Sequence, residues 1–143
     1  MAKTFKLTIL SAERELYSGD AEALTISTEM GEITAMADHR PLVANLEPGE
    51  LKIQKSGNQT DWLFVGGGVL EFAPKNECRV LADVAERVEE IDEKRAEEAR
   101  ERAKKSLEAA KSEPEVAEAK VALLKALARI RIAEKNRRLR GRR

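Results

Sequence analysis

The most informative pattern of charged and apolar side chains for ligand binding is in residues 91–96, which read IDEKRA. If this stretch is helical, Ile91 and Arg95 are one turn apart and Arg102 lies two turns further on, so the three share a face with Asp92 at its border. A carboxylate accepts hydrogen bonds, and guanidinium groups bind phosphates. This face could bind a phosphate-bearing ligand, although such spacing is more often that of an ordinary solvated ion-pair face.

A second positively charged group follows near the end of the sequence. Lys125 and Arg129 are one helical turn apart and could close the same site from a second helix. From Arg129 onward the only acidic residue is Glu134, although the chain as a whole has no net charge. The basic residues of this end are Arg129, Arg131, Lys135, Arg137, Arg138, Arg140, Arg142 and Arg143.

This basic end admits three explanations. Positive charge near a helix C-terminus complements the helix dipole. The same residues could instead bind an acidic protein, or the hairpin could be a module that binds nucleic acid. The expected helices contain no aromatic residue for base stacking and the chain is not basic overall, which argues against nucleic acid.

No residue pattern predicts an active site or a metal site. Three glycines at residues 66–68 are not followed by Lys-Ser or Lys-Thr, so a phosphate loop is not expected. His39 has no partner at metal-ligand spacing, and Cys78, the only cysteine, has no neighbouring base. The single cysteine favours a reducing compartment, and no apolar run is long enough for a membrane span. We expect a cytoplasmic protein without catalytic residues, metal or catalytic cofactor.

Short alternating segments dominate the first part of the chain. Period-two alternation of apolar residues indicates strands with one buried face. We expect strands at residues 5–10, 14–17, 21–28, 31–36, 42–46, 51–55, 62–65, 69–72 and 78–81. Turn-forming residues stand at 18–20, 48–49 and 56–59. Residues 1–85 are predicted to form an antiparallel β-sandwich or flattened barrel.

Strong helix formers fill residues 86–143, which we expect to form an antiparallel α-helical hairpin. Ser112 is a capping residue and Pro114 suits a first helical turn, so the connection lies near residues 112–114. The first helix, of about 25 residues, has a narrow apolar stripe made mostly of Ala, whereas the second has a wider stripe of Val, Leu and Ile. Because Ala buries little area, the hairpin is predicted to be marginally stable.

In combination, several segments resemble the epsilon subunit of bacterial rotary, F-type, ATP synthases, over essentially the whole chain. The segments are residues 7–17 (LTILSAERELY), 31–33 (GEI), 38–43 (DHRPLV), 64–71 (FVGGGVLE) and 81–86 (LADVAE). Residues 34–37 (TAMA) depart from the family, because a Gly-Ile-Leu-Pro-like run is common there.

The resemblance implies a non-catalytic subunit of the central stalk, peripheral to the cytoplasmic face of the bacterial membrane. The sandwich would bind the gamma subunit and the ring of c subunits, coupling proton or sodium flow to ATP synthesis. The hairpin would inhibit ATP hydrolysis at the alpha and beta subunits. The contacts expected for inhibition are Arg129, Arg131, Lys135, Arg137 and Arg138.

In some members of this family the folded-down hairpin binds regulatory ATP through a motif of the form Ile/Leu-Asp-x-x-Arg-Ala. Residues 91–96 match this motif. The resemblance therefore implies a regulatory ATP site, with the participation of magnesium left open. Its expected residues are Ile91, Asp92, Arg95, Ala96, Arg102, Lys125 and Arg129.

Overall fold

The computed structural model describes residues 2–141, and the chain divides into two compact units after Arg87. The first unit is the predicted β-sandwich. Its strands are β1 (Phe5–Ser11), β2 (Glu15–Ala21), β3 (Ala23–Thr28), β4 (Gly31–Met36), β5 (Leu42–Lys55), β6 (Gln59–Ala73), β7 (Glu77–Ala82) and β8 (Ala85–Arg87).

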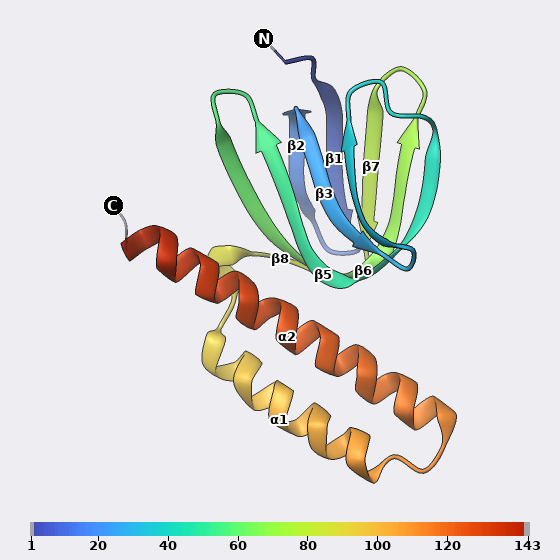
Figure 1. Ribbon diagram of the computed structural model, residues 1–143, viewed down its shortest axis with the longest axis vertical. Helices are drawn as coiled ribbons and strands as arrows, with labels where there is room; N and C mark the ends of the chain where they lie inside the picture. Colours follow the sequence, from blue (N-terminus) through green and yellow to red (C-terminus); the bar gives the residue numbers. More distant parts are fainter. Residues whose placement is uncertain (1, 142–143) are drawn as a thin grey trace. The chain divides into compact units, whose positions relative to one another are not determined.

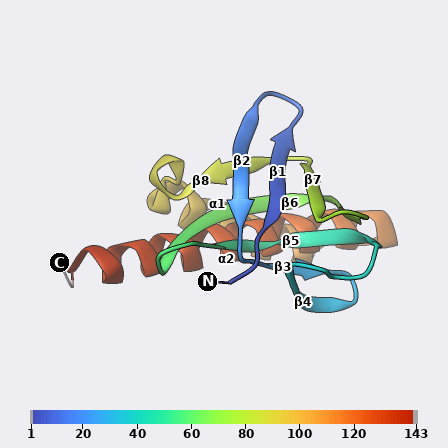
Figure 2. The same ribbon diagram turned by 90° about the horizontal axis from the view of Figure 1, so that it is seen from above.

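The strands form one continuous sheet that folds over on itself. Its order is β2-β1-β7-β6-β5-β3-β4, and β8 pairs with β6 outside this path. Neighbours are antiparallel except β1 and β7, which run parallel. The long strands β5 and β6 both bend (Figures 1 and 2), so that β3 pairs mainly with the later part of β5, and β7 with the later part of β6.

Two predicted turns lie inside strands instead. Residues 18–20 belong to β2, because their backbone pairs in register with β1. Residues 48–49 belong to β5, at a point where the register between β3 and β5 shifts. The missing N–H of Pro48 therefore falls in a bulge, where a proline is tolerated. The turn predicted at residues 56–59 is confirmed at 56–58.

The glycines at residues 66–68 also lie within a strand, because β6 is continuous where two strands were predicted. Gly67 and Gly68 have φ angles of +106° and +136°, which residues with a side chain rarely adopt. A Cβ atom on Gly68 would overlap the carbonyl oxygen of Leu81 on β7. Glycine at these positions lets β6 bend while it stays paired with β7.

The core of the sandwich consists of large aliphatic and aromatic side chains from both layers. Phe5 and Phe72 pack with their ring centroids 5.3 Å apart. Each fully buried side chain of this size contributes about 1.5–3 kcal/mol. Fully buried members are Phe5, Leu7, Ile9, Leu24, Ile26, Leu51, Ile53, Leu70 and Phe72.

The short strand β8 was not predicted, and arginine side chains connect it to β2 and to Arg14, the residue before β2. Arg14 Nη2 donates to the carbonyl oxygen of Ala85 at 3.5 Å, and Arg87 Nη2 donates to that of Leu16 at 3.2 Å. On its other side β8 pairs with residues 63–65 of β6. Guanidinium groups thus satisfy edge carbonyls that a backbone ladder would otherwise satisfy.

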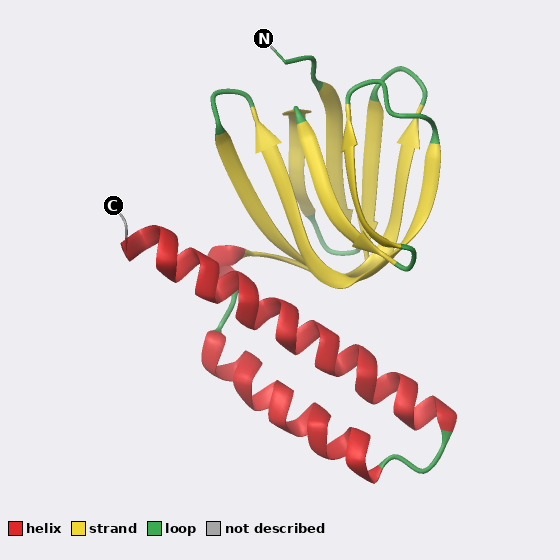
Figure 3. Ribbon diagram, viewed as in Figure 1, coloured by secondary structure: helices red, strands yellow, loops and turns green. Residues whose placement is uncertain are grey.

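The second unit is the predicted helical hairpin (Figure 3). A 3-10 turn, η1 (Val88–Glu90), precedes α1 (Glu93–Ala109) and α2 (Glu113–Gly141). With 17 residues, α1 is shorter than predicted, because β8 and η1 occupy the residues before its cap, Asp92. The predicted cap of α2 is confirmed, since Ser112 Oγ accepts from the amide of Glu115 at 3.3 Å. Pro114 lies in the first turn of α2.

Small residues form the seam between the two helices. Ala96 and Ala103 of α1 are buried, as are Ala119 and Ala126 of α2. On each helix the two are a heptad apart, and the pairs lie at equal distances from the turn at Lys111, so antiparallel helices bring them face to face. Such a seam allows close approach of the backbones, as the sequence predicted.

Replacing Gly68 by Ala is expected to destabilise the sandwich severely. The added Cβ can avoid the Leu81 carbonyl only if β6 moves away from β7, so we expect a loss of about 3 kcal/mol or more in the free energy of unfolding. Gly57→Ala is the control, because Gly57 also has a positive φ of 79° but open space around its Cβ. It should cost about 1 kcal/mol. Urea unfolding measures both, and equal losses would contradict a role for close packing at Gly68.

Candidate functional site

A groove runs between α1 and α2. Its volume is about 680 Å³, within the range of about 300–1,000 Å³ that is usual for small-molecule sites. Alanines make up much of its lining, so the helices leave room where larger side chains would fill the space. The lining residues are Ala99, Arg102, Ala103, Ser106, Ala109, Glu115, Glu118, Ala119, Ala122, Lys125 and Arg129.

The groove brings together three residues of the expected ATP site, Arg102, Lys125 and Arg129. Arg102 comes from α1 and is exposed, whereas Lys125 and Arg129 come from α2 and are half-buried. Because partly enclosed charges are screened less than fully solvated ones, positive side chains from both helices make this part of the groove attractive to phosphate groups.

The opposite end of the groove, near the turn, is acidic. Glu115 and Glu118 line it, and Glu115 Oε2 also accepts a hydrogen bond from the backbone amide of Lys111 at 3.2 Å. The groove is therefore basic away from the turn and acidic beside it. Such a polarity would favour an anionic ligand whose phosphates lie away from the turn, toward Lys125 and Arg129.

The other expected ATP residues lie before the groove along α1. Asp92 is the N-cap, and its Oδ1 accepts from the amide of Arg95 at 3.2 Å. Ala96 is buried in the seam, Ile91 is half-buried and Arg95 is exposed. The first lining residue, Ala99, follows one turn after Arg95. In this structure the motif residues start and pack α1, and a ligand must extend beyond the groove to reach them.

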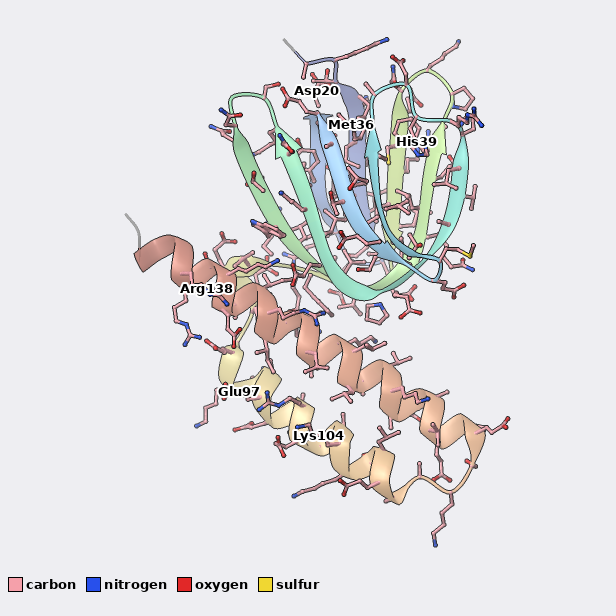
Figure 4. All side chains as sticks on the ribbon, viewed as in Figure 1. Asp20, Met36, His39, Glu97, Lys104 and Arg138 are labelled. Atoms are coloured by element: carbon pink, nitrogen blue, oxygen red, sulfur yellow. The ribbon has the colours of Figure 1, made fainter. Side chains whose placement is uncertain are left out.

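The basic residues expected to bind partners lie on the last part of α2, where Arg131 is exposed and Lys135 half-buried. Arg137 Nη2 lies 3.1 Å from Oε1 of Glu93, the first residue of α1. Arg138, labelled in Figure 4, lies 4.0 Å from Glu134 one turn before it. Arg142 and Arg143 lie outside the described residues.

Sequence reasoning missed several groups at this site. Ser106, Glu115 and Glu118 line the groove, and Glu93 pairs with Arg137. Helical spacing could have predicted two of the lining residues. Glu118 lies on the same helical face as Lys125, and Ser106 is one turn from Arg102. The ion pair had no such signal, since it joins residues far apart in the sequence.

The residues considered for other chemistry have structural roles. Burial raises the pKa of the Cys78 thiol to about 12, so it stays protonated at neutral pH. The centroid of the His39 ring lies 5.4 Å from that of Phe72, and its Nδ1 is 2.7 Å from the Arg40 carbonyl oxygen. Within residues 2–141 no group of three or more His, Cys, Asp or Glu side chains could hold a metal ion.

A membrane-spanning helix is not found within the described part of the chain. No helix there combines the length and the apolar composition that crossing a bilayer requires.

Comparisons with known proteins match both units. Residues 4–88 match the family model described as the β-sandwich domain of the ATP synthase delta/epsilon chain, and residues 89–134 match its long α-helix domain. The ATP synthase epsilon chain of Nitrosococcus oceani is 41% identical over 138 residues, which cover 92% of this chain and 97% of the relative.

Solved structures share the fold at lower identity. One chain of the Euglena gracilis mitochondrial ATP synthase, in a structure of its OSCP, F1 and c-ring parts, is 24% identical with a TM-score of 0.78, over 87% of this chain and 78% of that one. One chain of the central stalk and c-ring structure from Tetrahymena thermophila is 18% identical with a TM-score of 0.52, over 63% and 71% of the chains. With both family models and a close relative spanning nearly its whole length, this chain belongs to the delta/epsilon family of ATP synthase subunits, as an epsilon subunit.

Proposed function

We propose that this epsilon subunit is a non-catalytic part of the central stalk, at the cytoplasmic face of a bacterial membrane. Its sandwich binds the gamma subunit and the c ring, coupling proton or sodium flow to ATP synthesis, and its hairpin regulates ATP hydrolysis. The relative from Nitrosococcus oceani supports the role in ATP synthase. The structures with a similar fold come from assemblies whose names include the F1 part, the central stalk or the c ring.

An apolar row on the outside of the sandwich supports binding of gamma there. Val69 of β6 and Leu81 of β7 are directly paired and are 37% and 54% exposed. Leu10 of β1 continues the row beside Leu81, and Val43 of β5 is 68% exposed. Paired residues of neighbouring strands place their side chains on one face, so the row offers an apolar contact surface to a protein partner.

The closed hairpin binds ATP in its groove, and the observation that carries this proposal is that Arg102, Lys125 and Arg129 all line it. The phosphates lie on these cations, while the base extends toward Ile91 and Asp92. One oxygen of Asp92 accepts from its own helix, which leaves the second for the adenine amino group. Bound at a hundred times its dissociation constant, ATP would stabilise the closed hairpin by about 2.7 kcal/mol.

The open hairpin inhibits hydrolysis through α2. Val121 and Leu124 are exposed, and Leu123 and Leu127 are half-buried, so α2 has more apolar surface than α1 covers. An extended α2 places this surface against gamma and presents the basic end to acidic segments of the alpha and beta subunits. Each exposed ion pair contributes only about 0.2–1 kcal/mol, whereas desolvated interfacial pairs couple by about 1.5–7 kcal/mol.

Arg102→Ala is expected to weaken ATP binding about tenfold or more, because a lost hydrogen bond to a charged group costs about 1.5–3 kcal/mol. Arg102 is exposed, so its removal should not disturb folding. Lys104→Ala is the matched control, since Lys104 is an exposed cation of the same helix outside the groove (Figure 4). Isothermal titration of ATP into the full chain measures both variants.

Arg100 would be a poorer control, because its Nε is buried without a hydrogen-bond partner within the described residues. Equal losses of affinity in the Arg102 and Lys104 variants would show that ATP is attracted by the general positive charge of α1 and not by a specific site in the groove. Arg95→Ala then tests the reach of the ligand: a loss of affinity places a ligand group beyond the groove, at the motif.

Replacing Arg129, Arg131, Lys135, Arg137 and Arg138 together by Gln is expected to raise ATP hydrolysis by the assembled synthase while synthesis continues. Single replacements should do little, because each exposed pair is weak. The assay should follow release of tightly bound ADP, which blocks turnover by another route. If the variant and the unaltered complex then hydrolyse ATP at the same rate, the basic end does not inhibit.

A further inference from the structure

An ion pair between Glu93 and Arg137 connects the start of α1 with the last part of α2, which are far apart in the sequence. Glu93 begins α1, and Arg137 lies near the end of α2. Their side chains approach to 3.1 Å, with Arg137 67% exposed and Glu93 30% exposed. We propose that this ion pair holds the hairpin closed at the end opposite the turn. The regulatory role of this ion pair rests on the function proposed above, in which the open hairpin is the inhibitory form.

The position of the pair gives it leverage over opening. The covalent turn at residues 110–112 holds one end of the hairpin, so helices that separate must part first at the other end. There η1 lies against α2, and the nearest seam residues, Ala96 and Ala126, are small. Ile130 and Ile132 of α2 are also buried near this end, so the ion pair acts together with apolar burial in resisting separation.

The pair also competes with the partner contacts. Arg137 is among the five cations proposed to meet acidic segments of the alpha and beta subunits, and its guanidinium cannot serve Glu93 and a distant partner at once. Glu93 loses little when Arg137 leaves, because a carboxylate in the first turn of a helix is stabilised by the helix dipole and by water. Closing and opening thus exchange one carboxylate partner of Arg137 for another.

Glu93→Gln and Arg137→Gln should each raise the population of the open hairpin about two- to fivefold, the range that an exposed ion pair supports. The double variant should open little more than either single variant, because the second change removes no further interaction. Hydrogen exchange of amides in residues 93–99 and 130–138 of the full chain, without ATP, measures the opening.

Glu97→Gln is the matched control. Glu97 is an exposed carboxylate one turn along the same helix (Figure 4), and its replacement should leave exchange unchanged. The double variant distinguishes loss of the ion pair from loss of the interaction between Glu93 and the helix dipole. A lost dipole interaction at Glu93 would not depend on Arg137. The proposal fails if Glu93→Gln behaves like Glu97→Gln, or if the two single effects multiply in the double variant.

Hydrolysis by the assembled synthase separates this proposal from the inhibitory role. If the pair holds the hairpin closed, Glu93→Gln should strengthen inhibition, because it leaves all five cations in place and favours the open form. Coupled exchange effects with unchanged hydrolysis would establish the ion pair and contradict inhibition by the open hairpin. Unchanged exchange would contradict the ion pair whatever the rate of hydrolysis.

Discussion

The hairpin depends on a seam of alanines. Ala96, Ala103, Ala119 and Ala126 are buried, but burying a methyl-sized group contributes only about 0.8 kcal/mol, against about 1.5–3 kcal/mol for a Leu or Ile. Two of them, Ala103 and Ala119, also line the groove, where their small side chains leave space between the helices. The alanine seam therefore contributes little to holding the helices together, and Ile130 and Ile132 of α2 are the large buried side chains beside it.

The sandwich is built by the opposite principle. Its core consists of large side chains such as Phe5 and Phe72, and its long strands bend without losing their partners because Gly68 fits where any side chain would overlap β7. Arg14 and Arg87 bind edge carbonyls across the gap between β2 and β8. A well-packed unit of this kind would suit permanent attachment to a stalk, and a hairpin with a seam of small residues would suit the proposed regulation.

Much of this arrangement follows from local sequence, and the exceptions have one cause. Alternation revealed the strands, and Ser112 with Pro114 located the helical turn, because these signals act within a few residues. Turn chemistry at residues 18–20 and 48–49 misled, because pairing with neighbouring strands overrides local preference. Helical spacing predicted that Arg102, Lys125 and Arg129 lie together, and they line one groove. The capping role of Asp92 and the ion pair of Glu93 depend on contacts that only folding creates.

The central claim is that the hairpin opens far more readily than the sandwich unfolds. Native-state hydrogen exchange at increasing urea concentration tests it most directly, because it gives an opening free energy for each amide. We expect the amides of α1 and of α2 before Ala128 to exchange through openings at least about 2 kcal/mol less costly than those of β1, β6 and β7. Equal opening free energies with the same dependence on urea would show one cooperative unit and contradict the account.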